Sequence, residues 1–255
     1  MVKIVVFDSG FGSLSIIKEI RKKIKAEVIY FADQANFPYG KKSILQLRRI
    51  INKTINFLEN EFKPDLIIVG SNTPSILLGR FNSSKIIGVY PPLREASKKS
   101  KYSSIGILAT QNVVKSKKLD ALIRQNVPKK VKVLKINASP LVELVESGKF
   151  INQKLYCKNK IKLILHKQFE DNHLDVVTLS STHLPFILPI LHQLFPTIQF
   201  LDPSEAIITK IMKHHSYIKS KKSTFTIYSS GKTRLFQTQL NKIGIKRKVK
   251  FLKIH

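Results

Sequence analysis

Two clusters of small hydrogen-bonding residues stand in corresponding places in the two halves of the chain, each directly after a short apolar run. The first cluster is Ser71, Asn72 and Thr73, and the second is Ser181, Thr182 and His183. Hydroxyl, amide and imidazole groups donate and accept hydrogen bonds, and a histidine can polarise the residue beside it. The two clusters could therefore hold one small polar molecule from opposite sides.

The apolar runs before the clusters predict buried strands over residues 66–69 and 176–179, because both runs are short, apolar and continuous. In open α/β sheets, ligands bind at the carboxyl ends of the strands. The first predicted strand, residues 3–7, also ends on polar side chains, those of Asp8 and Ser9. We therefore expect these polar residues at the carboxyl edges of parallel sheets.

Strands alternate with helices along the whole chain, which predicts parallel sheets flanked by helices. The pattern restarts after Pro91 and Pro92, so we expect two similar α/β lobes, each with a mainly parallel sheet. Ser43 is the expected cap of the longest early helix. The other predicted strands are 28–31, 85–89, 104–109, 131–136, 200–202 and two near the end; the predicted helices are 14–24, 43–62, 75–81, 113–125, 140–147, 151–169, 184–194, 203–214 and one between the last two strands.

The size and cysteine content limit the classes of protein that the chain can belong to. With 255 residues and a hydrophobic fraction of 43%, it can bury one large core or two modest ones. No apolar run approaches the roughly 20 residues that cross a bilayer, so we expect a cytoplasmic protein without a membrane partner. Cys157 is the single cysteine, which excludes an intrachain disulfide and a cysteine-based metal site. We also expect no metal at His214 and His215, because adjacent histidines do not share a helix face.

The charge is unusual, with 45 Lys and Arg against 16 Asp and Glu and a formal net charge of +29. Such an excess attracts nucleic acid and anionic surfaces without sequence specificity. The basic residues are spread over nearly every segment, which favours a compositional bias toward Lys, Ile and Asn. We find no zinc finger, ribonucleoprotein motif or phosphate-binding loop in the sequence. We therefore expect nucleic-acid binding to be at most non-specific.

The chain resembles the cofactor-independent amino-acid racemases, and specifically glutamate racemase, in six segments that follow in the right order and spacing: VVFDSGFGSL, YFADQANFPYGKKS, IIVGSNTPS, IGILATQNVVKS, PLVELVESG and LSSTHLPFILPIL. The resemblance runs from Val5 to about Asp202. It implies two α/β lobes with the active-site cleft between them. In that arrangement the first lobe comprises residues 1–92 and about 205–255, and the second comprises residues 93–204.

The resemblance also implies a function and partners. Proteins of this kind are isomerases that use no cofactor and supply D-glutamate for peptidoglycan synthesis, and hence for cell-wall biogenesis and cell shape. The expected ligand is a small amino acid, either glutamate or aspartate. Family members commonly form dimers, so a homodimer is the oligomer that the resemblance suggests.

The two catalytic positions of that family depart from its pattern in this sequence. In glutamate racemases one cysteine thiolate removes the proton from Cα, and a second cysteine thiol delivers a proton to the opposite face. The resemblance places Ser71 and Ser181 at these two positions. A thiol ionises near pH 8.5, whereas the pKa of a hydroxyl is far higher and close to that of water, a difference on the order of 10 kcal/mol. We predict that racemisation is lost or strongly reduced.

Most other positions of the family's site match. The resemblance assigns substrate binding to Asp8, Ser9, Tyr39, Gly40, Asn72, Thr73, Thr182 and His183, and catalytic roles to Ser71, Ser181, Asp8, His183 and Glu146. Two positions differ, because Val113 stands where the family usually has threonine and Leu184 where it usually has tyrosine. Without the resemblance, an acid after a strand, such as Asp8 or Asp33, would more often be a helix cap or turn former.

Three interpretations remain open from the sequence. The first is a glutamate racemase homologue with lost or reduced activity. The second is an active isomerase or lyase of the same superfamily, in which Asp8 or His183 supplies the base. The third is a non-enzymatic basic protein that binds nucleic acid. Glutamate binding separates the first two from the third, and product formation separates the first from the second.

Overall fold

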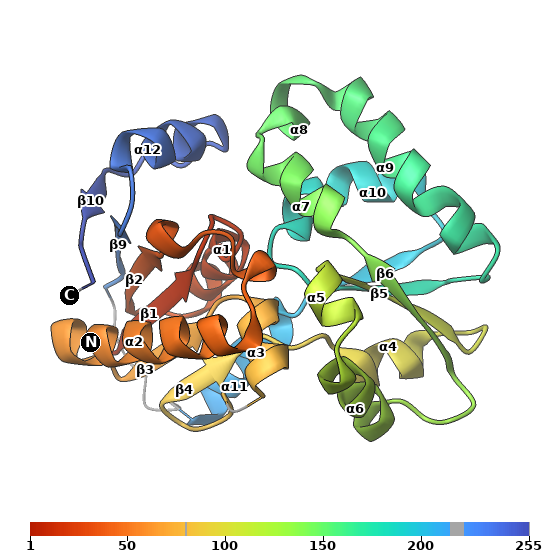
Figure 1. The fold of residues 1–255 in the computed structure, drawn as a ribbon, viewed down its shortest axis with the longest axis horizontal. Helices are drawn as coiled ribbons and strands as arrows, with labels where there is room; N and C mark the ends of the chain where they lie inside the picture. Colours follow the sequence, from red (N-terminus) through yellow and green to blue (C-terminus); the bar gives the residue numbers. More distant parts are fainter. Residues whose placement is uncertain (80, 215–221, 255) are drawn as a thin grey trace. The chain divides into compact units, whose positions relative to one another are not determined.

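Segments rich in apolar β-branched residues form the parallel strands of this protein (Figure 1). The computed structural model describes residues 1–79, 81–214 and 222–254. The chain divides into two compact units, Met1–Val89 with Ser204–His255, and Tyr90–Pro203. His215 of the histidine pair lies outside the described residues. None of the described helices is long and apolar enough to cross a membrane.

The first unit contains a six-stranded parallel sheet with the order β10-β9-β2-β1-β3-β4. Its strands are β1 (Lys3–Asp8), β2 (Glu27–Ala32), β3 (Leu66–Val69), β4 (Ile86–Gly88), β9 (Thr224–Ser229) and β10 (Val249–Phe251). Its helices are α1 (Leu14–Lys23), η1 (Gln34–Asn36), η2 (Tyr39–Lys41), α2 (Ile44–Phe62), α3 (Asn72–Leu78), α11 (Ser204–His214) and α12 (Thr233–Lys242). All four residues of β3 are buried, as a central strand covered on both faces requires.

The second unit contains a four-stranded parallel sheet with the order β6-β5-β7-β8. Its strands are β5 (Ser104–Ala109), β6 (Lys132–Asn137), β7 (Val176–Leu179) and β8 (Gln199–Leu201). Its helices are α4 (Leu93–Lys99), α5 (Gln111–Val114), α6 (Lys117–Asn126), α7 (Ser139–Glu146), α8 (Lys149–Asn152), α9 (Lys154–Glu170), η3 (Leu184–Ile187) and α10 (Leu188–Leu194). Figure 1 shows α9 and α10 on one side of this sheet and α4 and α6 on the other.

The two units repeat one topology. The strand order β2-β1-β3-β4 in the first unit corresponds to β6-β5-β7-β8 in the second. The first unit then adds β9 and β10 beyond β2. The predicted fold class, two similar units with mainly parallel sheets flanked by helices, is therefore confirmed.

Several helices differ from their predicted bounds for local reasons. The helix predicted over 75–81 lies at Asn72–Leu78, because Pro74 is tolerated in a first turn and Gly79 ends the helix in the left-handed conformation at φ 66°. The helix predicted over 113–125 is interrupted at Ser116, whose hydroxyl accepts the Leu119 N–H. Local capping residues therefore set these helix ends, even where apolar periodicity predicts one continuous helix.

Two further helix predictions need correction, and one helix was not predicted. The helix predicted over 151–169 is two helices, α8 and α9, which meet at Gln153. The helix predicted over 184–194 begins as the 3₁₀ segment η3, and Pro185 and Pro189 each fall in the first turn of their own segment. The helix without a predicted counterpart is α4, which begins directly after Pro92.

The predicted cap at Ser43 is a reciprocal capping box. The Ser43 hydroxyl accepts the Gln46 N–H at 3.2 Å, and the Gln46 side chain accepts the Ser43 N–H at 3.0 Å. We expect Ser43→Ala to lower the free energy of unfolding by about 1 kcal/mol, because one N–H at the start of α2 loses its partner. Urea unfolding measures this change, with Lys53→Ala on the exposed side of the same helix as the control. Equal losses in both variants would contradict the capping role.

Candidate active site

The first cluster lies at the carboxyl edge of the six-stranded sheet. Phe7 in β1 is paired with Val69 in β3, so Asp8 and the residues after Val69 come to the same edge. The Gly70 N–H donates to the Phe7 carbonyl at 2.8 Å. A Cβ at Gly70 would lie only 2.6 Å from the Ser13 Cβ, so only glycine lets the chain leave β3 at this point.

Asp8, Ser9 and Tyr39 form a hydrogen-bonded chain at that edge. The Ser9 N–H donates to Asp8 Oδ1 at 2.7 Å, and the Tyr39 N–H donates to the Ser9 hydroxyl at 3.3 Å. Asp8 and Ser9 are both buried. Gly40 follows Tyr39 in η2, so the loop that contains these two residues is held against the end of β1. The structure thus brings four of the predicted binding residues together within one unit.

Ser71, Asn72 and Thr73 begin α3 at the same edge. Ser71 is half-buried, and its side chain does not cap the helix. The Asn72 Nδ2 donates to the Val89 carbonyl at 3.3 Å, whereas its Oδ1 is buried without a hydrogen-bond partner in the described part of the chain. An unpaired buried acceptor costs about 1–3 kcal/mol, so a donor that reached Asn72 Oδ1 would be stabilising.

Asp33 organises this edge, and the sequence analysis does not assign it a site role. Its carboxylate accepts the Tyr39 hydroxyl at 2.8 Å, the Asn36 amide at 2.9 and 3.0 Å, and the Ser230 hydroxyl at 3.0 Å. Burial raises the pKa of Asp33, and the hydrogen bonds from Asn36, Tyr39 and Ser230 oppose that rise. Asp33 directly follows β2, whose last residue is paired with Asp8 at the end of β1. This position after a predicted strand was the feature of the sequence that could have indicated a site role for Asp33.

Tyr39 is buried at this edge, and its hydroxyl is bonded to Asp33. Its side chain is 1% exposed, and its hydroxyl donates to Asp33. Burial, followed by the nearby Asp33 charge, raises the pKa of Tyr39 well above its ordinary value. The phenol thus stays protonated, and its hydrogen bond to Asp33 holds the loop in place.

The second cluster lies at the carboxyl edge of the four-stranded sheet. Leu108 in β5 is paired with Leu179 in β7, and the Ser180 N–H donates to the Leu108 carbonyl at 2.9 Å. The following residues Ser181, Thr182 and His183 are 6%, 3% and 7% exposed. The polar cluster thus follows β7 in the way that the first cluster follows β3.

His183 and Glu146 form a close pair, although 37 residues separate them in the sequence. The His183 Nε2 and Glu146 Oε1 atoms are 2.5 Å apart, and both side chains are largely buried. Glu146 is the last residue of α7, so the end of this helix fixes the orientation of the imidazole ring. Val113 and Leu184, the two positions that differ from the family's usual residues, are fully buried apolar side chains.

Cys157 lies on the buried side of α9 and follows neither of the two strands that carry the clusters. Its side chain is 0% exposed, and burial raises the pKa of the thiol, an effect that the Lys149 charge opposes. A buried thiol with a raised pKa is not a source of thiolate at neutral pH. In the part of the chain that the structure describes, no three His, Cys, Asp or Glu side chains are grouped so that they could hold a metal ion.

The repeated parallel sheet and its two polar strand-end clusters define a class, the two-unit α/β proteins that include the cofactor-independent amino-acid racemases. Glutamate racemase of Haemophilus ducreyi is 33% identical over 214 residues, which cover 82% of this chain and 80% of the relative. The chain therefore belongs to the glutamate racemase family. No protein-family model matches the chain.

Solved structures share the fold. The crystal structure of glutamate racemase isoform RacE1 from Bacillus anthracis matches with a TM-score of 0.86 at 21% identity, over 99% of this chain and 98% of that one. Escherichia coli glutamate racemase, in complex with L-glutamate and the activator UDP-MurNAc-ala, matches with a TM-score of 0.82 at 22% identity, over 100% and 99% of the two chains. None of these relatives is a lyase or a nucleic-acid-binding protein, so the other two interpretations gain no support.

Proposed function

We propose that this protein binds glutamate at the strand-end clusters but racemises it slowly or not at all. Ser71 and Ser181 would take the places of the two proton-transferring cysteines of the family. The observation that carries the proposal is the position of the one thiol, Cys157, which is buried in α9 with a raised pKa. No acidic thiol is then left to act on Cα.

The energetic argument rests on ionisation. Removing the Cα proton requires a base that is populated at neutral pH, and a serine hydroxyl is harder to ionise than a thiol by about seven pKa units. Protein environments shift a pKa by up to about 3–5 units. The gap is therefore larger than burial or a neighbouring charge can close, even with the His183–Glu146 pair in the same cluster as Ser181.

The remaining polar groups have the chemistry of an amino-acid site. Asp8 and the unpartnered Asn72 Oδ1 are acceptors suited to an ammonium group. Ser9, Thr73 and Thr182 offer hydroxyl donors suited to a carboxylate. We assign ligand binding to these groups. The role that we assign to the His183–Glu146 pair is to orient the second cluster.

The biological setting follows from the family. D-glutamate is the product that such proteins supply for peptidoglycan synthesis, and we place this protein in the cytoplasm with that pathway. A homodimer is the oligomer that we expect, and light scattering of the purified chain measures it.

We expect L-glutamate and D-glutamate to stabilise the natural chain against heat while neither is converted into the other. At a ligand concentration of 100 times Kd, the gain is about 2.7 kcal/mol, which raises Tm by several degrees. Thermal unfolding measures binding, and chiral chromatography measures turnover. Aspartate in the same titration decides which of the two amino acids fits.

The control for this experiment is a pair of asparagine variants. Asn72→Ala removes the buried acceptor and is expected to abolish the glutamate-dependent rise in Tm, whereas Asn159→Ala on the exposed side of α9 leaves it unchanged. A natural chain that glutamate does not stabilise would refute the binding proposal. Turnover at the rate of an ordinary racemase would refute the proposed loss of activity.

A further inference from the structure

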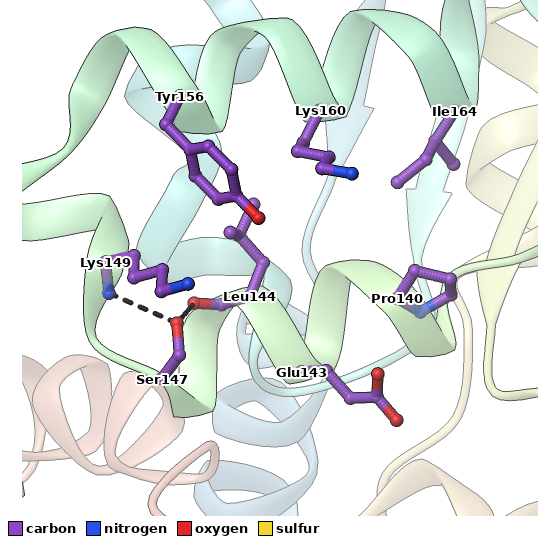
Figure 2. A pocket seen from close by; sticks show the side chains of 8 residues that line it. All are labelled: Pro140, Glu143, Leu144, Ser147, Lys149, Tyr156, Lys160 and Ile164. Carbon is purple, nitrogen blue, oxygen red and sulfur yellow. Dashed lines mark hydrogen bonds between the residues drawn. The ribbon is translucent and has the colours of Figure 1, made fainter.

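A cavity of about 270 Å³ opens between α7 and α9 in the second unit. Its lining includes Glu143, Leu144 and Ser147 from α7 and its end, Lys149 from α8, and Tyr156 and Lys160 from α9. Figure 2 shows the α9 side chains extending toward α7 across this space. We call this cavity the α7–α9 pocket.

Two lysine ammonium groups and one hydroxyl converge on the α7–α9 pocket. The Lys149 Nζ lies 4.9 Å from the centre of the Tyr156 ring, and the Lys160 Nζ lies 5.9 Å from it. In Figure 2 the Tyr156 hydroxyl points into the space between these ammonium groups and α7, and the Glu143 carboxylate points away from α9. Among the described residues, neither ammonium forms an ion pair with a carboxylate.

We propose that the α7–α9 pocket binds a phosphate group, either free phosphate or the phosphate of a small monoester. A phosphate carries a charge of about −1.5 to −2 at pH 7, which matches two lysines, and its oxygens accept several hydrogen bonds at once. The Tyr156 hydroxyl is a further donor. Leu144 and the Tyr156 ring provide apolar surface, so the organic part of a monoester would also find contacts.

The α7–α9 pocket is adjacent in the chain to the His183–Glu146 pair. Ser147, at the rim of the pocket, directly follows Glu146; its hydroxyl donates to the Leu144 carbonyl at 2.7 Å and accepts the Lys149 N–H at 3.3 Å. Phe150, next to Lys149, contacts Phe186 in η3 with the ring centres 6.2 Å apart. A phosphate that links Lys149 to α9 would therefore hold the turn that presents Glu146 to His183.

A binding experiment without glutamate tests the site independently of the proposed function. Inorganic phosphate, with chloride at the same ionic strength as the reference, is titrated into the natural chain while Tm is followed. We expect phosphate to stabilise the natural chain in a saturable way. In the double variant Lys149→Gln with Lys160→Gln, phosphate affinity should fall about tenfold or more, because charged hydrogen bonds are lost. The matched control, Lys154→Gln with Lys162→Gln, removes two exposed lysines from α9 and is expected to leave the affinity unchanged.

Two further measurements define the ligand and the coupling. Glycerol 3-phosphate binding more tightly than inorganic phosphate would identify a monoester site, and equal binding would identify a site for the phosphate group alone. The imidazole NMR signals of His183 should shift on phosphate binding in the natural chain and not in the pocket variant. Absence of saturation, or equal weakening in the control variant, would overturn the site, and unshifted His183 signals would overturn the coupling.

Discussion

A chain that carries both Ser71→Cys and Ser181→Cys is expected to interconvert L- and D-glutamate at least about a thousandfold faster than the natural chain. The two substitutions restore groups that ionise near pH 8.5, so a thiolate base and a thiol acid become available at neutral pH. The rest of the proposed site is unchanged, including the buried Asp8 and the His183–Glu146 pair. Circular dichroism or chiral chromatography follows the approach to a racemic mixture.

The matched control moves one thiol by a single residue. Ser180→Cys combined with Ser71→Cys keeps two thiols, but residue 180 belongs to the sheet: its N–H donates to Leu108, and its hydroxyl lies 3.0 Å from the Thr178 hydroxyl. This variant is expected to remain inactive. If it matched the activity of the first variant, the assignment of Ser181 to the catalytic position would be wrong.

The single variants separate the two half-reactions. With one thiol present, one enantiomer should exchange its Cα hydrogen with deuterium from the solvent, while net racemisation stays slow. The two single variants should act on opposite enantiomers, because each thiol serves one face of Cα. Exchange of both enantiomers by one single variant would show that another group of the protein acts as a base.

Replacing Asp33 should have the largest effect on stability. We expect Asp33→Ala to lower the free energy of unfolding by about 3 kcal/mol or more, because the buried Tyr39 hydroxyl and the Ser230 hydroxyl lose their acceptor. Urea unfolding measures the loss. Asp65→Ala is the control, since Asp65 accepts the Lys3 N–H in an exposed position and should cost far less. Similar losses in the two variants would show that the Asp33 cluster, formed by Asp33 with Asn36, Tyr39 and Ser230, contributes no more to stability than an exposed hydrogen bond does.

The pH dependence of the same residue has a definite sign. Because burial raises the pKa of Asp33 above its ordinary value of 3.8, the folded chain holds this proton more tightly than the unfolded chain does. The tighter binding of this proton adds to the free energy of unfolding. This contribution is fully present below pH 3.8 and is lost as the pH rises through the raised pKa of folded Asp33. The free energy of unfolding of Asp33→Asn, relative to the natural chain, should therefore increase over that interval. A decrease would mean that the hydrogen bonds outweigh burial.

Strands were easier to predict from the sequence than helix ends. Residues 66–69 and 176–179 were predicted with the bounds that the structure has, because each is a continuous apolar run that polar or glycine residues limit. Helix ends depend on single hydrogen bonds, such as the one between Ser116 and Leu119, which apolar periodicity does not reveal. The short basic α4 also lacks a clear apolar stripe and was missed.

The candidate site shows the same division. The strand-end clusters could be located because a strand prediction fixes where its carboxyl end lies. The partner of His183 could not be derived from spacing, since Glu146 is on a different element. The family resemblance gave Glu146 a catalytic role but did not pair it with His183. The Asp33 cluster joins residues as far apart as Asp33 and Ser230, so its existence depends on the pairing of β2 with β9.

The pairing of β2 with β9 also affects how the protein can be synthesised. The second unit is contiguous, Tyr90–Pro203, so its sheet can close while the ribosome is still adding later residues. The first unit begins earlier in the chain, but the outer edge of β2 is covered only when β9, Thr224–Ser229, has been synthesised. Until then a nascent chain exposes unpaired backbone groups along β2, which makes this edge the point where chaperone binding would protect the emerging polypeptide.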